Sequence, residues 1–283
     1  MKSGVINFLK PVGMTSSDAV GIVRKATGIK KVGHLGTLDP LASGVLPIAF
    51  GKATRLFDVF LQKKKTYIAM FDFSYSTDTL DNDGEITARC DKIVTKEDVE
   101  KVLPQFAGKI EQYPPKYSAK NVGGERAYDL ARAGKQFELS PSVVEIYSLK
   151  LLRKEENGFV FEIVCSAGTY IRSLARDIGE SLGACGTMTA LIRTESGKFS
   201  LRTAVTKDEL SNGFEQYAVS AEEALSDYPM LCLKCDEAFK VQNGVSVSVC
   251  VGNGLYRLYS DGVFVGAIEV ENNTTGKRVV IDD

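Results

Sequence analysis

Tryptophan is absent from the 283 residues, and histidine occurs once, as His34. The six cysteines are too few and too irregularly spaced for a disulfide scaffold, so we expect a protein of the reducing cytoplasm. A serine or cysteine catalytic triad would have to use His34, and no Gly-x-Ser-x-Gly elbow occurs. These scarcities argue against a secreted disulfide protein and against a triad hydrolase.

Motifs for metals and nucleotides are missing as well. Cys232 and Cys235 have the spacing of half a zinc site, but only Cys250 follows them, so two strand residues are the simpler interpretation. Residues 78–84 resemble a calcium loop whose last ligand would be Cys90, which favours a solvated acidic turn. No phosphate-binding loop occurs, and no apolar run approaches the ~20 residues of a membrane span. We therefore expect no metal, no nucleoside triphosphate site and no membrane segment.

Charge is nearly balanced over the whole chain, at a formal −1, but it is unevenly distributed. Residues 1–65 carry 11 basic and 3 acidic side chains, a net +8, and residues 116–135 carry 5 and 2, a net +3. Any single cluster, such as residues 63–65, is commonly just a solvated face. Two basic segments in an otherwise acidic chain nevertheless suit a phosphate-bearing partner that is bound over a limited area.

Hydrophobic periodicity changes repeatedly between helical and extended patterns, which predicts a mixed α+β fold. Capping residues Thr15 and Thr95 precede two of the expected helices. Further helices are expected at 125–133, 170–182 and 221–225, a strand at 65–74, and a hairpin from 143–152 and 159–165. Three short β runs, 245–251, 254–260 and 263–270, predict a small all-β module. The expected domains are therefore residues 1–227 and 228–283.

The most distinctive segment is residues 33–47, in which glycine and proline punctuate a tightly folded loop. Such loops hold catalytic groups on rigid scaffolds. Asp39 precedes a proline, which restricts the direction of its carboxylate. From spacing alone Asp39 is either a catalytic carboxylate or an Asx-turn residue, and the turn is the more common case. His34 in such a position is more often a surface residue than a ligand.

Residues 33–47 resemble the signature of the B family of tRNA pseudouridine synthases, which isomerise uridine 55 in the TΨC loop of tRNA. Five further motifs match that family in order: residues 10–16, 65–67, 114–119, 126–128 and 168–177. The resemblance implies a mixed, largely antiparallel sheet flanked by helices, and a C-terminal module like the PUA RNA-binding domain. It also implies a cytoplasmic monomer that needs no cofactor and takes tRNA as its partner.

The resemblance assigns roles to individual residues. Asp39 matches the nucleophile, which attacks either ribose C1′ or uracil C6, and Arg172 matches the cation beside it. Tyr67 matches the residue that stacks on the flipped uracil, although its position also suits an ordinary core aromatic. Tyr170 matches a second active-site tyrosine that lines the pocket beside C5.

Other matches concern RNA binding. His34 matches a residue that fills the space left by the flipped base, and Leu191 matches an apolar contact to that base, although an ordinary core leucine is an equally good interpretation. Basic side chains expected at phosphates are Lys10, Arg24, Lys30, Lys31, Lys63, Lys64 and Lys65.

A second hypothesis is a non-catalytic tRNA-binding protein or RNA chaperone that uses the same groove. The complete set of Asp39, Tyr67, Tyr170 and Arg172 favours the enzyme. The enzyme hypothesis requires Asp39 within ion-pair distance of Arg172, and side chains on opposite faces of the fold would exclude it.

Overall fold

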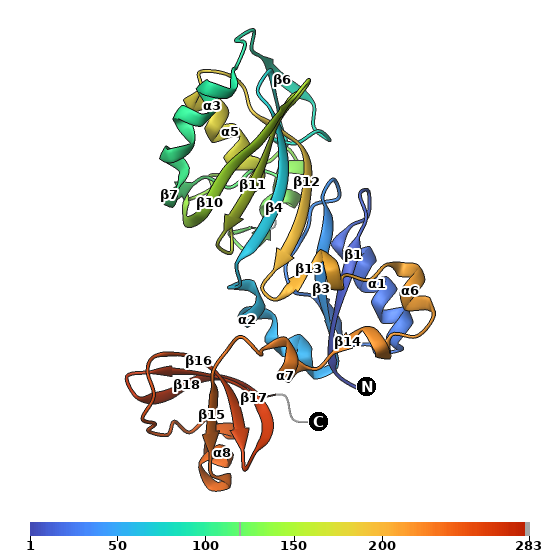
Figure 1. Cartoon of the computed structure of the whole chain (residues 1–283), viewed down its shortest axis with the longest axis vertical. Coiled ribbons are helices and arrows are strands. Elements are labelled where there is room, and N and C mark those ends of the chain that lie inside the picture. The colour runs from blue at the N-terminus through green and yellow to red at the C-terminus, as the bar shows by residue number, and fades with distance from the viewer. Residues whose placement is uncertain (119, 281–283) are drawn as a thin grey trace.

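A mixed sheet runs through most of the computed structural model, which describes residues 1–118 and 120–280 (Figure 1). Along the sheet the order is β14 (Ala218–Val219), β1 (Gly4–Lys10), β3 (Ser43–Phe50), β12 (Thr187–Ser196), β4 (Lys65–Asp72), β11 (Gly158–Cys165), β10 (Ser142–Glu155) and β7 (Gly108–Gln112). Two short strands attach to this path: β13 (Phe199–Ser200) pairs with β12, and β2 (Val32–His34) pairs with β3. Only the β12–β3 pairing is parallel among these described strands, so the largely antiparallel sheet is confirmed.

The helices flank this sheet, as the sequence predicts. Thr15 caps α1 (Ser16–Thr27) with a capping box, and Gly28 ends it in the left-handed conformation. Thr95 caps α3 (Lys96–Val102) in the same way. In Figure 1, α3 and α5 (Ile171–Ser181) lie beside β10 and β11, whereas α1 and α6 (Lys207–Ser211) lie beside β1. The remaining short helices of this part are α2 (Phe57–Leu61), α4 (Ala127–Arg132) and α7 (Ala221–Ala224).

Strand β4 shows how the sequence pattern builds the core. Its side chains alternate, with Tyr67, Ala69 and Phe71 buried and their neighbours half-buried. The Phe71 ring lies 4.8 Å from that of Phe161 on β11, between ring centroids. Burying a phenylalanine side chain such as that of Phe71 contributes about 1.5–3 kcal/mol relative to exposure. The predicted alternation is therefore confirmed, and it fixes which face of β4 points inward.

Two small hairpins extend from the large sheet. Strands β5 (Tyr75–Thr77) and β6 (Ile86–Arg89) form one, and β8 (Asn121–Val122) and β9 (Glu125–Arg126) form the other. The first hairpin continues directly from the end of β4, so its connecting turn, residues 78–85, is carried toward α5.

The C-terminal part forms a separate four-stranded sheet, in the order β15 (Met230–Leu233), β16 (Gly254–Ser260), β17 (Val263–Glu271) and β18 (Thr274–Val280). The predicted C-terminal β module is confirmed by this sheet, but the module is not all-β, because α8 (Cys235–Gln242) packs Ala238 and Val241 against it. The predicted strand at 245–251 is also wrong: only Ser248 forms a bridge there, to Thr274. Alternating valines in that segment pack as an irregular chain on the sheet instead.

The two sheets are joined by specific contacts. Ala267 of β17 belongs to the same hydrophobic cluster as Leu56, Ala224 and Leu225. The Tyr259 hydroxyl donates to Oε1 of Glu222 at 2.7 Å, just after α7 begins. The C-terminal sheet is therefore packed against the main part of the molecule.

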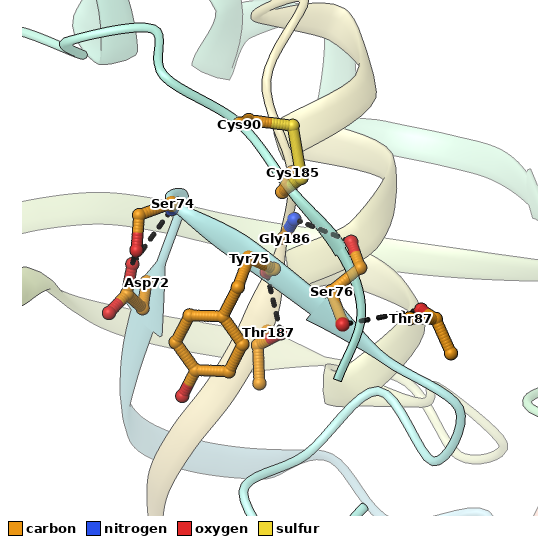
Figure 2. Close-up of a disulfide and its surroundings, with 9 residues drawn as sticks. All are labelled: Asp72, Ser74, Tyr75, Ser76, Thr87, Cys90, Cys185, Gly186 and Thr187. Carbon is orange, nitrogen blue, oxygen red and sulfur yellow. Dashed lines mark hydrogen bonds between the residues drawn. A yellow bond between two sulfur atoms is a disulfide. The ribbon is translucent and has the colours of Figure 1, made fainter. Parts of the chain in front are cut away.

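A disulfide joins Cys90 and Cys185, which the sequence interpretation did not anticipate (Figure 2). It links the segment after β6 to the residue two positions before β12. Around it, Gly186 N–H donates to Oγ of Ser76, and the Thr187 hydroxyl donates to the Tyr75 carbonyl. The sequence did not indicate this pair, because two cysteines separated by 95 positions leave no local spacing signal.

The other cysteines that the structure describes are free thiols: Cys165, Cys232, Cys235 and Cys250. Cys232 lies in β15, but Cys235 begins α8 and is not a strand residue. Among residues 1–118 and 120–280, no cluster of three or more His, Cys, Asp or Glu side chains could hold a metal ion. None of the described helices is long and apolar enough to cross a membrane.

Candidate active site

The loop that carries Asp39 is held by backbone hydrogen bonds on both sides of it. The buried Ser16 hydroxyl at the start of α1 accepts from the Leu38 N–H and donates to the Leu38 carbonyl, both at 2.9 Å. The Pro40 carbonyl accepts from Gly13 N–H at 2.8 Å, and the Asp39 carbonyl from Ala42 N–H at 3.0 Å. Residues 10–16 therefore support the signature loop through hydrogen bonds to its backbone.

Lys10 belongs to this supporting segment, residues 10–16, and is fully buried. Its ammonium donates to the carbonyls of Met14 at 2.6 Å, Pro11 at 2.9 Å and Pro40 at 3.4 Å. Burial lowers the pKa of Lys10 to about 8. The prediction that Lys10 contacts RNA phosphate is wrong, because its cationic end is directed at carbonyls beneath the Asp39 loop.

Lys65 requires the same correction. It lies on the buried face of β4 and donates to the carbonyls of Leu61 and Lys63, both at 2.6 Å. Burial lowers its pKa to about 8. The alternation that places Tyr67 inward also places Lys65 inward, so the period-two pattern already contained this information.

Asp39 and Arg172 form a two-point ion pair. Nε of Arg172 lies 3.0 Å from Oδ2 of Asp39, and Nη2 donates to Oδ1 at 3.2 Å. The arginine side chain is 8% exposed, whereas the aspartate is 33% exposed. The expected proximity of these residues is confirmed. The Asp39 side chain is therefore partly open, whereas the guanidinium beside it is enclosed.

Arg172 is itself anchored by three further groups. Its Nη1 donates to the Thr79 carbonyl at 3.0 Å and lies 3.5 Å from Oδ2 of Asp81, and its Nη2 donates to the Tyr117 carbonyl at 3.1 Å. A planar guanidinium with donors in a fixed fork is suited to such multipoint binding. The orientation of Arg172 is therefore set from sides other than Asp39.

Asp81 was not singled out by sequence reasoning, which took residues 78–84 as a solvated turn. It is buried, and its Oδ1 accepts from the Thr79 hydroxyl at 2.6 Å and from Asp83 N–H at 3.2 Å. The acidic turn is thus folded inward against Arg172, which corrects that interpretation. The aspartate-rich composition signals a turn but does not say which of its carboxylates is buried.

Tyr170 lies directly before α5 and is half-buried. The buried side chain of Gln112 binds its backbone on both sides: Nε2 donates to the Tyr170 carbonyl at 3.0 Å, and Oε1 accepts from Tyr170 N–H at 2.8 Å. Burial raises the pKa of the Tyr170 phenol. Gln112 is a positioning contact that no sequence motif indicated.

Tyr67 and Leu191 lie on the adjacent strands β4 and β12, and both are buried in the main hydrophobic cluster. Burial raises the pKa of Tyr67, and the positive charge of Arg193 opposes that rise. Both positions agree with the core interpretation that the sequence left open. Strand β12 pairs with β3, which carries the end of the signature loop, and β4 is the next strand beyond β12.

His34 is the last residue of strand β2, so its backbone is held in the sheet and does not lie in a loop as expected. Its Nδ1 is buried and has no hydrogen-bond partner among the described residues. Burial lowers the pKa of His34, with smaller contributions from Arg193 and Arg126. The side chain is therefore a neutral, half-buried ring at neutral pH.

The other predicted phosphate contacts divide into two kinds. Lys31 and Lys64 are exposed, and the Lys64 ammonium lies 4.0 Å from the centre of the Tyr147 ring. Lys63 pairs with Asp227 at 2.7 Å and lies 3.7 Å from the centre of the Tyr228 ring. Lys63 is therefore engaged with the two residues at the domain boundary, whereas Lys31 and Lys64 remain available to a ligand.

Comparison with known proteins decides the family. The N-terminal domain of the TruB family pseudouridylate synthases matches residues 24–171, and the tRNA pseudouridylate synthase B C-terminal domain matches residues 172–230. The chain belongs to the TruB family of pseudouridylate synthases. Asp39, Tyr67 and Tyr170 lie within the first match, and Arg172 and Leu191 within the second.

Two similar curated proteins carry the same name. A "tRNA pseudouridine synthase B" of Caldanaerobacter subterraneus is 41% identical over 268 residues, with 93% of each chain covered. One of Clostridium perfringens is 40% identical over 275 residues, covering 93% of this chain and 94% of the relative. The chain is thus a pseudouridine synthase of the TruB type.

Solved structures agree with this assignment. A "Cbf5-Nop10-Gar1 Complex" matches with a TM-score of 0.74 and 27% identity over all of this chain and 84% of that one. An "H/ACA RNP bound to a substrate RNA containing 2'-deoxyuridine" matches with a TM-score of 0.71 and 25% identity over 99% of this chain and 84% of that one. The large sheet and the C-terminal sheet together therefore form an architecture shared with these solved structures.

Within this TruB-family fold, four of the matched motifs converge around Asp39. Residues 10–16 support its loop, β4 carries Tyr67, and residues 168–177 supply Tyr170 and Arg172. The motif at 114–119 brings the Tyr117 carbonyl to Arg172, although Ala119 lies outside the described residues. The fixed donors and the single open carboxylate suit covalent chemistry at an uncharged base.

Proposed function

We propose that the chain isomerises uridine to pseudouridine at position 55 in the TΨC loop of tRNA, with Asp39 as the nucleophile. The observation that carries the proposal is the partly open carboxylate of Asp39, held from behind by the enclosed guanidinium of Arg172. The names of the curated relatives support tRNA as the substrate.

The reaction needs few parts. The N1–C1′ bond of the uridine is broken, the base turns, and a C5–C1′ bond is formed, with one proton lost at C5 and one gained at N1. A nucleophile at ribose C1′ or uracil C6 and a pocket for the detached base are sufficient, without any cofactor. Asp39 supplies the nucleophile, and Arg172 stabilises the carboxylate in its attacking orientation.

Other residues act on the base. A base must leave the RNA stack to reach Asp39, at a cost of a few kcal/mol, and stacking on Tyr67 returns about 1–3 kcal/mol. His34 then fills the space left in the RNA loop, and Leu191 contacts the base from β12. Tyr170 lines the pocket beside C5 as a neutral phenol, because burial raises its pKa.

RNA binding is assigned to exposed basic and aromatic groups. Lys64 lies over Tyr147, and the Arg132 guanidinium lies 4.9 Å from the Tyr128 ring centre. Together with Lys31 they offer phosphate contacts and stacking surfaces on the main part of the molecule. We assign catalysis to residues 1–227 and an auxiliary RNA-binding role to residues 228–283, whose last three residues lie outside the described part. The chain acts as a cytoplasmic monomer in this proposal.

The test is tritium release from an unmodified tRNA transcript labelled at C5 of uridine. The wild-type chain is compared with Asp39→Asn at protein concentrations that give equal binding of the transcript. Release by the wild type and none by the variant supports the isomerase and its nucleophile. Binding without release by either protein would instead indicate a non-catalytic tRNA-binding protein, with Asp39 as a turn residue.

A further inference from the structure

Arg193 is a buried cation without an ionic partner in the described part of the chain. Its side chain is one of the largest that is fully enclosed, at 1% exposure. No carboxylate lies within ion-pair distance of it among residues 1–118 and 120–280. Enclosing a guanidinium is costly unless its donors are satisfied, so the contacts that satisfy them indicate what the residue is for.

Three backbone carbonyls of the signature loop accept hydrogen bonds from the guanidinium, which also acts on the Tyr67 phenol. Nε donates to the Val45 carbonyl at 2.7 Å, Nη2 to the Gly36 carbonyl at 3.2 Å, and Nη1 to the Thr37 carbonyl at 3.3 Å. Gly36 and Thr37 precede Asp39, and Val45 follows it. One rigid guanidinium therefore joins the segment before Asp39 to the segment after it. The position of Asp39 depends on this link between the two segments.

The backbone of Arg193 connects the same loop to the strand of Tyr67. In the sheet, Arg193 pairs with Gly44 of β3 on one side and with Tyr67 of β4 on the other. The approach to β3 is close: a Cβ on Gly44, whose φ is +107°, would lie 2.2 Å from the Arg193 carbonyl oxygen. Directly paired residues of an antiparallel ladder share a face, so Arg193 and Tyr67 lie side by side.

We propose that Arg193 is a positioning residue that sets the nucleophile Asp39 relative to the base-stacking Tyr67. This inference rests on the proposed function. Arg193 is enclosed within the protein at 1% exposure, so it acts through the residues it holds. It acts by holding the loop of one group and the strand of the other in a single rigid unit, and a displacement of about 1 Å at a reacting group can cost 10²-fold in rate.

The experiment compares Arg193→Lys and Arg193→Gln with the wild type. Three quantities are measured: the single-turnover rate of tritium release at saturating enzyme, the Kd for the tRNA transcript, and the thermal midpoint. We expect both variants to lose at least 30-fold in rate while the Kd changes less than threefold. Lysine keeps the positive charge but has a single ammonium in place of the planar guanidinium. A loss of rate in Arg193→Lys would therefore show that the geometry of the guanidinium matters and not its charge alone.

Asn7→Ala provides the matched control. Asn7 is also buried in the large sheet, and its amide donates to the Ser200 carbonyl and to Oγ1 of Thr203, both at 2.9 Å and away from the signature loop. At a similar loss in thermal midpoint, Asn7→Ala should keep its rate within threefold of the wild type. The proposal is overturned by a folded Arg193→Lys that turns over at the wild-type rate, or by an equal rate loss in Asn7→Ala.

Gly36→Ala tests the same contact from the loop side if the Arg193 variants do not fold. Gly36 has a φ of +133°, so an alanine there strains the backbone and moves the carbonyl that Nη2 of Arg193 binds. The rate should again fall with little change in Kd, and an unchanged rate would refute the proposal. Absence of tritium release by the wild type would instead reject the proposed function itself.

Discussion

Asp39 and Arg172 lie 133 positions apart in sequence, yet their side chains meet in a two-point ion pair of 3.0 and 3.2 Å. The pair joins the signature loop to the start of α5. Arg172 is also bound by the Thr79 and Tyr117 carbonyls and by Asp81. Because these contacts surround the guanidinium, the carboxylate of Asp39 is oriented by a group that cannot readily move.

Replacement of Arg172 by lysine tests whether the orientation of the Asp39 carboxylate depends on the guanidinium. An ammonium cannot contact both oxygens of Asp39 and two carbonyls in the same planar arrangement. We expect the single-turnover rate of tritium release to fall about 10²–10³-fold, on the order of the loss of one oriented electrostatic contact, with a smaller effect on tRNA affinity. Arg176→Lys, on the same helix, is the control, since Arg176 pairs with the adjacent Asp177. Equal losses in both variants would contradict the assigned role.

Asp81 should contribute to both stability and rate. Asparagine in its place removes a buried charge that lies 3.5 Å from Arg172 and accepts from Thr79. We expect Asp81→Asn to lower the free energy of unfolding by about 1–3 kcal/mol and to reduce the rate of tritium release. Asp83→Asn changes an exposed neighbour in the same turn and should leave both quantities nearly unchanged. Urea unfolding and the tritium assay measure the two effects.

Local patterns predicted much of this fold correctly. The capping boxes at Thr15 and Thr95 and the alternation of β4 depend on neighbours a few positions away, which the sequence displays directly. The family motifs supplied Arg172, because periodicity alone does not show that a residue on α5 meets a distant loop. The inward directions of Lys10 and Asp81 were missed for the same reason, since their partners are backbone carbonyls and a remote guanidinium.

The single histidine allows a direct electrostatic measurement. Burial lowers the pKa of His34, so in an NMR titration its imidazole resonance should move with a midpoint below 6.5. The unfolded chain takes up the proton at a higher pH than the folded chain. The stabilising contribution of neutral His34 is therefore present above pH 6.5 and is lost as the pH falls through the folded pKa. His34→Gln should remove this part of the acid sensitivity, and a midpoint at or above 6.5 would contradict the burial of the ring.

The predicted phosphate contacts can be separated by their salt dependence. Lys64 and Lys31 are exposed, so replacing either by alanine should weaken tRNA binding and reduce the slope of log affinity against log salt by about 1. Lys63→Ala should instead loosen the contact with Asp227 and Tyr228. Binding measured across a salt series therefore distinguishes these residues. An unchanged slope in Lys64→Ala would remove that residue from the RNA interface.

The Cys90–Cys185 disulfide should stabilise the chain without controlling its chemistry. Closing a loop of 95 positions restricts the unfolded state, and such crosslinks typically contribute about 2–4 kcal/mol. The native position of this region does not depend on the crosslink alone, because Cys90 N–H donates to the Ser74 carbonyl and Cys185 N–H to the Phe73 carbonyl.

The double variant Cys90→Ser, Cys185→Ser should therefore unfold at lower urea concentration yet release tritium at nearly the wild-type rate. Dithiothreitol should lower the stability of the wild type to that of the double variant and leave the double variant unchanged, since its remaining cysteines are free thiols. If six thiols react in the denatured, unreduced wild type, the crosslink is absent under those conditions. A large loss of rate at unchanged binding would instead show that the disulfide also holds the turn of Asp81 against Arg172.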